Sequence, residues 1–158
     1  MTISKFPKHF SREELLFSAA AVRLGIANNP ENERIEENLL KTANFLEYLR
    51  SLIAEKLGSE RQIKVLSCYR SPKLNKAVGG SKTSAHMNAL AADIIVPGMS
   101  VTELAKFIAT NVPHFDQLIV EFGQWVHIGI ATNNACRNEI LTAKKIDGQT
   151  KYLEGIVS

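Results

Sequence analysis

The chain has 158 residues, of which 45% are hydrophobic and 22% charged. This length and composition favour one hydrophobic core, so we expect a single domain over residues 1–158 and exclude a disordered chain. The formal net charge of +3 is not concentrated in a long Lys/Arg block, which argues against nucleic acid as a partner.

The first part of the chain is predicted to be helical. Ser11 and Glu14 match a capping box, and the apolar residues that follow favour one short amphipathic helix ending at Gly25. A second, longer helix begins at the Asn-Pro pair at 29–30 and ends at Gly58. Its apolar face is formed by Ile35, Leu39, Ala43, Leu46, Leu49, Ile53 and Leu57.

The middle of the chain is predicted to alternate strands with helices. Residues 63–69 favour a strand, and a short helix follows over residues 72–78. A polar Gly/Ser loop at 79–84 leads to a second apolar run at 91–96, which ends at a Pro-Gly pair. A capping box then begins a helix over residues 100–111.

The C-terminal part is predicted to contain a hairpin. Two strand-like runs, 117–122 and 125–131, flank a Gly-Gln turn. A helix is predicted at 137–145, and an Asp-Gly turn at 147–148 precedes a last short strand. Together the elements predict an α+β fold in which helices pack on a small, mostly antiparallel sheet.

Cysteine usage and apolar runs bear on the cellular setting. Cys68 and Cys136 are far apart and lack CxxC spacing, so we expect reduced, partly buried thiols. The first ten residues lack the apolar run of a signal peptide, and no segment approaches the ~18 apolar residues of a membrane span. We expect a soluble protein, made in the cytoplasm and exported by another route if at all.

Three polar residues stand out as candidate metal ligands. Asp93 interrupts an apolar strand, where a carboxylate is expensive to bury unless it is paired or bound to a cation. His127 interrupts another strand, and alternation places Trp125 on the same face as an aromatic wall. His86 ends the Gly/Ser loop. Each can be structural by itself, but together they provide the three protein ligands of a catalytic zinc site.

These residues fall within a recognisable order of motifs. Residues 84–93 read Ser-Ala-His-Met-Asn-Ala-Leu-Ala-Ala-Asp, which resembles the S-x-H-x-x-G-x-A-x-D signature of the zinc D-alanyl-D-alanine carboxypeptidase family. That family includes vancomycin-resistance D,D-dipeptidases and many phage endolysins. Tyr-Arg-Ser at 69–71 and Trp-Val-His at 125–127 match its flanking motifs. Two further segments look like its short, single-domain phage or prophage branch: residues 74–81 and 115–123.

The resemblance implies roles residue by residue. His86, Asp93 and His127 match the zinc ligands. Arg70 matches the arginine that binds a substrate carboxylate or polarised carbonyl, although a surface salt bridge is the alternative. Ser84 matches the signature serine, which supports the site by a hydrogen bond unless it is only a loop residue. Trp125 is expected to contact substrate.

The general base is less directly implied. Several relatives have an acidic residue three positions before the last ligand, where this chain has Gln124, which cannot accept a proton at neutral pH. We therefore predict Glu121 as the base, since a hairpin can return it toward the metal; the alternative is an exposed strand-end glutamate. Ala89 replaces the signature glycine, which costs about 1 kcal/mol if φ is positive there.

These features predict a zinc metallopeptidase that hydrolyses amide bonds in peptidoglycan stem peptides. It would act as a D,D-carboxypeptidase or an L-Ala-D-Glu-type endopeptidase, using water activated by Zn²⁺ and Glu121 in a cleft at the strand ends. Release through a phage-made or other membrane lesion would bring it to the wall.

One alternative is a non-catalytic cell-wall-binding or phage structural protein, which Gln124 favours; another is a zinc enzyme for unrelated small peptides. The oligomeric state cannot be read from the sequence.

Overall fold

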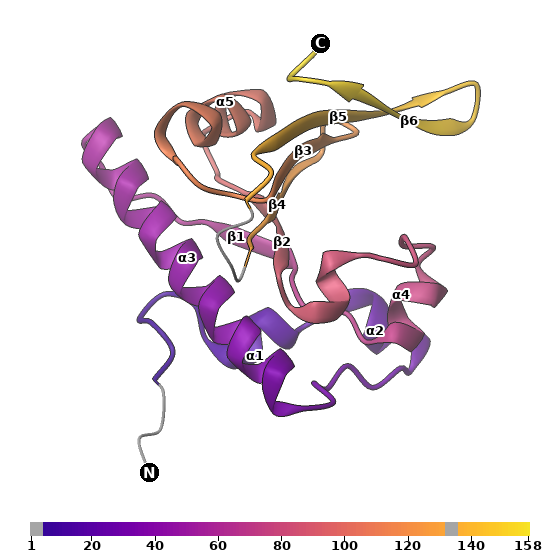
Figure 1. The fold of residues 1–158 in the computed structure, drawn as a ribbon. Coiled ribbons are helices and arrows are strands. Elements are labelled where there is room, and N and C mark those ends of the chain that lie inside the picture. Colours follow the sequence, from indigo (N-terminus) through magenta and orange to yellow (C-terminus); the bar gives the residue numbers. More distant parts are fainter. Residues whose placement is uncertain (1–4, 132–135) are drawn as a thin grey trace.

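A computed structural model describes residues 5–131 and 136–158, which form six strands in one sheet with helices around it (Figure 1). The helices are α1 (Arg12–Leu16), α2 (Ala19–Leu24), α3 (Glu33–Leu57), α4 (Pro72–Ala77) and α5 (Val101–Asn111), with a short 3₁₀ helix, η1 (Ala85–Asn88). The strands are β1 (Lys64–Ser67), β2 (Ala91–Ile95), β3 (Gln117–Glu121), β4 (Trp125–Gly129), β5 (Glu139–Ile146) and β6 (Gln149–Glu154).

The sheet has the strand order β1-β2-β4-β3-β5-β6. Every neighbouring pair is antiparallel except β3 and β5, which run parallel. The predicted α+β fold with a mostly antiparallel sheet is therefore confirmed. The predicted hairpin is also confirmed, as β3 and β4. No helix in the described part of the chain has the length and apolarity needed to cross a membrane.

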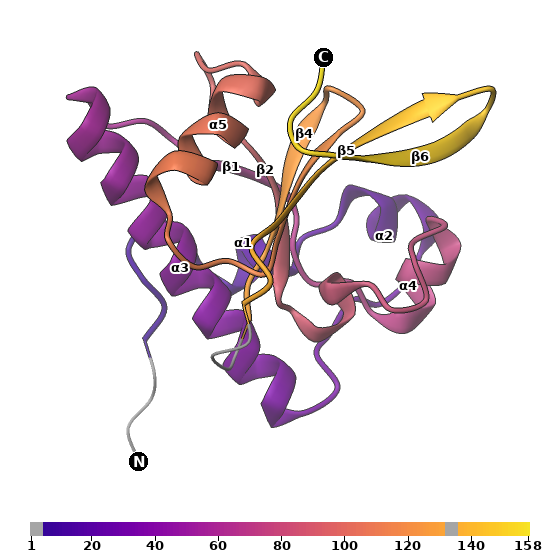
Figure 2. The same ribbon diagram turned by 45° about the horizontal axis from the view of Figure 1, so that its top comes forward.

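Helix α3 covers one face of the sheet, with α5 beside it (Figures 1 and 2). It begins after Asn32, whose side chain accepts a hydrogen bond from the Ile35 amide, and it ends at Gly58 in the left-handed conformation. Its buried apolar residues are Ile35, Leu39, Ala43, Leu46, Leu49 and Ile53. The sheet contributes alternate residues to the same core: Ala92, Ile94, Leu118, Val120, Val126 and Ile128.

Two predictions of local structure were wrong. The single helix expected up to Gly25 is divided into α1 and α2, because Phe17 is extended and Ser18 caps a new helix through the Ala21 amide. The helix expected at 137–145 is instead β5. This segment pairs with β3 on one side and β6 on the other, and these hydrogen bonds outweigh its local helical pattern.

The packing of α3 makes Leu46 a test of the core. Its side chain is fully buried, so we expect Leu46→Ala to lower the free energy of unfolding by about 3 to 5 kcal/mol. Leu57→Ala is the matched control, because Leu57 lies at the end of the same helix with 41% of its surface exposed, and it should lower the free energy by less than about 1 kcal/mol. Urea denaturation measures both. Equal losses would contradict this account of the core.

Candidate metal centre and active site

The face of the sheet opposite α3 forms the floor of a cleft of about 1240 Å³. Asp93 on β2 and His127 on β4 are directly opposite each other in the register, so their side chains share this face. Glu121, at the end of β3, is opposite Trp125 at the start of β4. All four line the cleft. Strand alternation thus separates an apolar face, packed on α3, from a polar face that carries the predicted site residues.

The third candidate ligand, His86, reaches the sheet from η1. Ser84 caps η1 by accepting a hydrogen bond from the His86 amide at 3.3 Å. Ala89 then turns the chain into β2 with φ 57° and ψ 30°, the left-handed conformation in which alanine costs about 1 kcal/mol relative to glycine. Two buried side chains of α3 hold this turn: Asn38 donates to the Asn88 carbonyl at 3.0 Å, and Thr42 donates to the Ala89 carbonyl at 2.6 Å.

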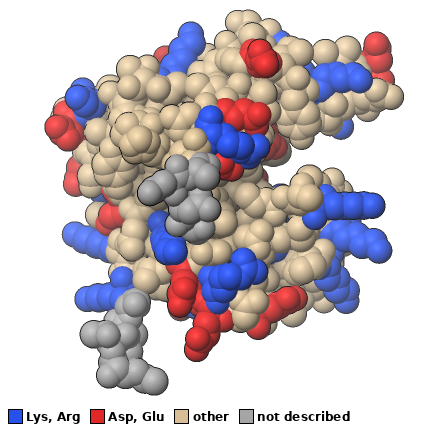
Figure 3. All heavy atoms as spheres, viewed as in Figure 1, with Lys and Arg blue, Asp and Glu red and all other residues tan. Residues whose placement is uncertain are grey.

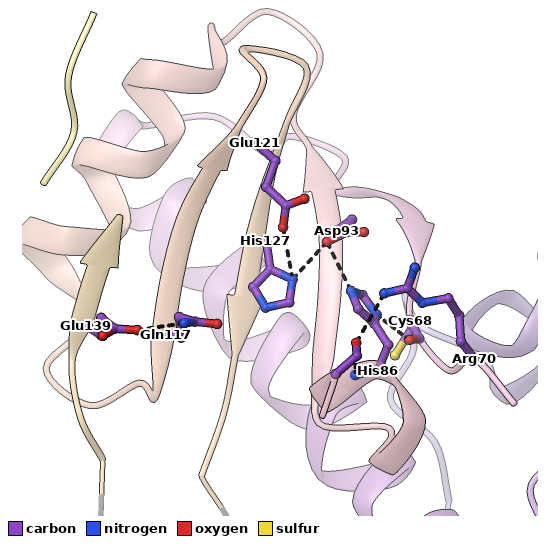
Figure 4. A network of polar contacts seen from close by, with 9 residues as sticks. Cys68, Arg70, His86, Asp93, Gln117, Glu121, His127 and Glu139 are labelled. Carbon is purple, nitrogen blue, oxygen red and sulfur yellow. Dashed lines mark hydrogen bonds and ion pairs between the residues drawn. The ribbon is translucent and has the colours of Figure 1, made fainter. Parts of the chain in front are cut away.

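His86, Asp93 and His127 are all buried and converge on one point (Figure 4). Asp93 Oδ1 lies 3.2 Å from His86 Nε2 and 3.1 Å from His127 Nδ1, and the three candidate ligand atoms are all within 4.8 Å of one another. Burial alone would raise the pKa of Asp93, but the two imidazoles hold this pKa well below its usual range. The carboxylate is therefore ionised and available as a ligand.

The hydrogen bonding of His86 fits a cation at this point. Its Nδ1 lies 2.6 Å from the Cys68 carbonyl oxygen, which can only accept, so Nδ1 carries the proton. A protonated Nε2 would donate to the Asp93 carboxylate, whereas in the neutral ring Nε2 presents a lone pair, and a cation between the two groups would bind both. Tetrahedral N and O ligands of zinc are about 3.3 Å apart, close to the two distances to Asp93. The donor set and its spacing thus fit a divalent metal ion.

Glu121 lies next to this cluster, with Oε1 3.5 Å from His127 Nδ1. Burial and the neighbouring Asp93 carboxylate raise the pKa of Glu121, although His127, Trp125 and Arg70 oppose the shift. Gln124, by contrast, is exposed in the turn between β3 and β4 and is not among the residues that line the cleft. Of the two positions considered for the general base, it is therefore Glu121, and not Gln124, that lies next to the candidate metal ligands.

Arg70 follows β1 and enters the cleft from the other side of His86 (Figure 4). Its Nη2 donates to Ser84 Oγ at 3.2 Å, while its Nε is buried with no hydrogen-bond partner among the described residues. Burial lowers the pKa of Arg70, against the opposing effect of Asp93 and Glu121, but a guanidinium stays charged at neutral pH. Arg70 is thus a half-buried cation with unused donors.

The two cysteines are free; Cys136 is partly buried as predicted, whereas Cys68 is fully buried. Burial raises the pKa of the Cys68 thiol, so its side chain is a poor metal ligand and a poor nucleophile. Its contribution to the site is the backbone carbonyl that orients His86. Metal-binding histidines commonly donate their second ring nitrogen in this way.

Comparison with known families agrees with this geometry. The model of the peptidase M15 family matches residues 8–129, which include every residue of the predicted site. The chain belongs to the peptidase M15 family. No curated protein matches it. Membership in the M15 family implies a metal-dependent hydrolase that acts on peptidoglycan, and the His-Asp-His cluster is a group of residues that can hold the metal.

The structure of this M15 family member also contains supporting residues that sequence reasoning missed. Asn38 and Thr42 lie on the buried side of α3 and bind the turn that carries His86. One signal was present: two polar residues, four positions apart, within an otherwise apolar helical face. A buried polar side chain must find a hydrogen-bond partner, so such a pair indicates a contact to backbone elsewhere.

Proposed function

We propose that this protein is a zinc-dependent peptidase that hydrolyses amide bonds in the stem peptides of peptidoglycan. The observation that carries the proposal is the convergence of two buried imidazoles and one buried carboxylate on the floor of a cleft. Two nitrogen ligands and one oxygen ligand are a set used by catalytic zinc, which leaves a coordination position for water or substrate.

His86, Asp93 and His127 would hold the metal through His86 Nε2, an Asp93 carboxylate oxygen and His127 Nδ1. A bound zinc ion supplies Lewis acidity and lowers the pKa of a coordinated water from about 15.7 to about 7. The Cys68 carbonyl and the turn at Ala89 keep the His86 ring in its ligating orientation.

Glu121 is proposed as the general base. Its carboxylate lies beside His127 on the cleft floor, where it can take a proton from the attacking water. The same carboxyl group can then donate this proton to the leaving amine nitrogen when the amide bond breaks. The position of Gln124 on the exposed turn does not weaken this role, because Glu121 and not residue 124 borders the cleft.

Arg70 is proposed to bind the substrate carboxylate or the polarised carbonyl oxygen. Its charged, partly desolvated guanidinium lines the cleft, and Ser84 fixes one of its terminal nitrogens. Charge-assisted hydrogen bonds of this kind contribute about 1.5 to 3 kcal/mol. Trp125 is proposed as an aromatic wall of the same substrate site.

Basic side chains near one opening of the cleft favour an anionic substrate, although of the six given next only Arg70 lines the cleft itself. Residues 61–92 contain six basic residues and no acidic one: Arg61, Lys64, Arg70, Lys73, Lys76 and Lys82. Basic side chains gather at the lower right of Figure 3, in the region of α4, where the cleft opens. Stem peptides carry several carboxylates, so this charge steers them toward the cleft. Action on the wall is in keeping with the family; release through a phage-made lesion stays a prediction.

The proposal is tested by mass spectrometry of purified sacculi digested with the protein and zinc. Loss of a terminal D-alanine would identify a D,D-carboxypeptidase, and a new D-glutamate amine would identify an L-Ala-D-Glu endopeptidase. No new amino groups at any pH or with any metal would instead indicate a non-catalytic wall-binding protein. Cleavage of free dipeptides without cleavage of muropeptides would indicate a peptidase for unrelated small peptides.

A further inference from the structure

The C-terminal hairpin of β5 and β6 forms a wall of the cleft although it lies beyond residues 8–129, the segment that matches the family. It extends past the rest of the sheet on the side away from α3 and lies above α2 and α4 in Figure 1 and Figure 2. Four of its residues line the cleft: Leu141, Lys145, Thr150 and Tyr152. The cleft therefore extends beyond residues 8–129, onto a part of the sheet that the family match does not include.

Register explains why these residues share a face. Lys145 is opposite Thr150, and Ala143 is opposite Tyr152, so all lie at alternate positions on the same side of the hairpin. Lys144 and Lys151 are opposite each other one position away, on the other side. The hairpin thus presents one lysine to the cleft and two lysines to the opposite side.

The distance between Glu121 and the hairpin determines which part of a bound substrate can contact the hairpin. Glu121 pairs with Ala143, which pairs with Tyr152, so Tyr152 stands two strands from the proposed base. Neighbouring strands are about 4.8 Å apart, which gives a separation of about 10 Å. An extended peptide covers that distance in about three residues. Groups two or three residues from the scissile bond would therefore reach the hairpin.

The Lys145 side chain is directed toward the site by aromatic contacts. Its Nζ lies 5.7 Å from the centroid of the Phe122 ring, a cation–π arrangement. Phe122 in turn packs edge-to-face against Trp125, with ring centroids 6.2 Å apart. Within residues 5–131 and 136–158, no carboxylate forms an ion pair with Lys145. The ammonium group is free to bind an anion that enters the cleft.

We propose that the cleft-facing side of this hairpin is a second subsite, which binds a side-chain or α-carboxylate of the stem peptide through Lys145. Tyr152, 59% exposed, provides an aromatic surface and a hydroxyl beside it. The subsite selects for substrates that carry a carboxylate two or three residues from the cleaved bond. This inference rests on the proposed function, since it names a feature of the substrate of the same cleft.

Calorimetric titration tests the subsite, with a Glu121→Gln background and zinc present so that cleavage is slow. The probes are a synthetic stem pentapeptide and its analogue in which the carboxylates other than the C-terminal one are amidated. Lys145→Ala should weaken binding of the first peptide by about two- to fivefold and leave the amidated peptide unaffected. Lys151→Ala removes the same charge from the opposite side of the hairpin and should change neither affinity.

Three results would overturn the subsite: no measurable binding of the carboxylated peptide, no loss with Lys145→Ala, or equal losses for both peptides. Failure of the proposed function is a separate result. In that case the wild-type protein would leave sacculi intact, while the dependence of carboxylated-peptide binding on Lys145 would persist.

Discussion

Replacement of His86 by alanine is expected to abolish peptidoglycan hydrolysis and zinc binding together. The change removes one of three proposed ligands and leaves the buried Asp93 carboxylate with a single imidazole neighbour, His127. Loss of groups that only support a ligand already lowers metal affinity or activity by about 10- to 100-fold, so loss of a ligand should exceed 100-fold. Amine release from sacculi and zinc content by elemental mass spectrometry measure the two effects.

The thermal midpoint gives a readout independent of activity. An ion that binds only the folded state stabilises it by mass action, so zinc should raise the midpoint of the wild-type protein and not that of His86→Ala. His114→Ala is the matched control, because His114 is exposed and is not among the residues lining the cleft. Retention of both zinc binding and hydrolysis by His86→Ala would exclude His86 as a ligand.

Glu121→Gln is expected to lower kcat by about 10²- to 10⁴-fold, the usual contribution of a general base. Glutamine keeps the size and shape of glutamate, but it cannot accept a proton from water at neutral pH. We therefore expect the fold, zinc content and KM to change little. Steady-state kinetics on a defined muropeptide, with zinc content measured in parallel, separates this effect from loss of the metal.

Gln124 provides the control for this prediction. Gln124→Glu places a carboxylate where several relatives have their acidic residue, but on an exposed turn of this chain. In the Glu121→Gln background it should not restore activity. Recovery of activity in the double variant would show that a carboxylate at position 124 can act as the general base. Activity of Glu121→Gln alone within threefold of wild type would show that Glu121 is not the general base.

Local patterns in the sequence were sufficient to predict α3 and the hairpin of β3 and β4. In α3 the apolar residues recur with the helical period, and the helix ends at Gly58 as predicted, but it begins at Glu33 after the cap Asn32 and not at the Asn-Pro pair at 29–30. In the hairpin, two apolar runs flank a turn that contains Gly123. Asp93 and His127 were conspicuous for a related reason, since each interrupts a run of buried apolar residues.

Features that depend on contacts between distant segments could not be predicted from local sequence patterns. The β5 segment is a strand because β3 and β6 lie on either side of it, and no property of residues 137–145 alone specifies those neighbours. The division between α1 and α2 depends on whether Ser18 caps a helix or continues one, and its sequence allows both. The roles of His86 and Arg70 came from a resemblance, because neither residue interrupts an apolar run.

The hydrogen bonds from Asn38 and Thr42 make α3 and the turn that carries His86 parts of one cooperative unit. Any local opening that displaces α3 breaks the hydrogen bonds to the carbonyls of Asn88 and Ala89. The turn is then no longer fixed, and His86 moves with it. If His86 is a metal ligand as proposed, backbone fluctuations of α3 are coupled to occupancy of that site, and by reciprocity a bound ion would slow amide exchange along the helix. Substitutions far from the cleft, on the buried side of α3, would thus change how tightly the proposed site holds an ion.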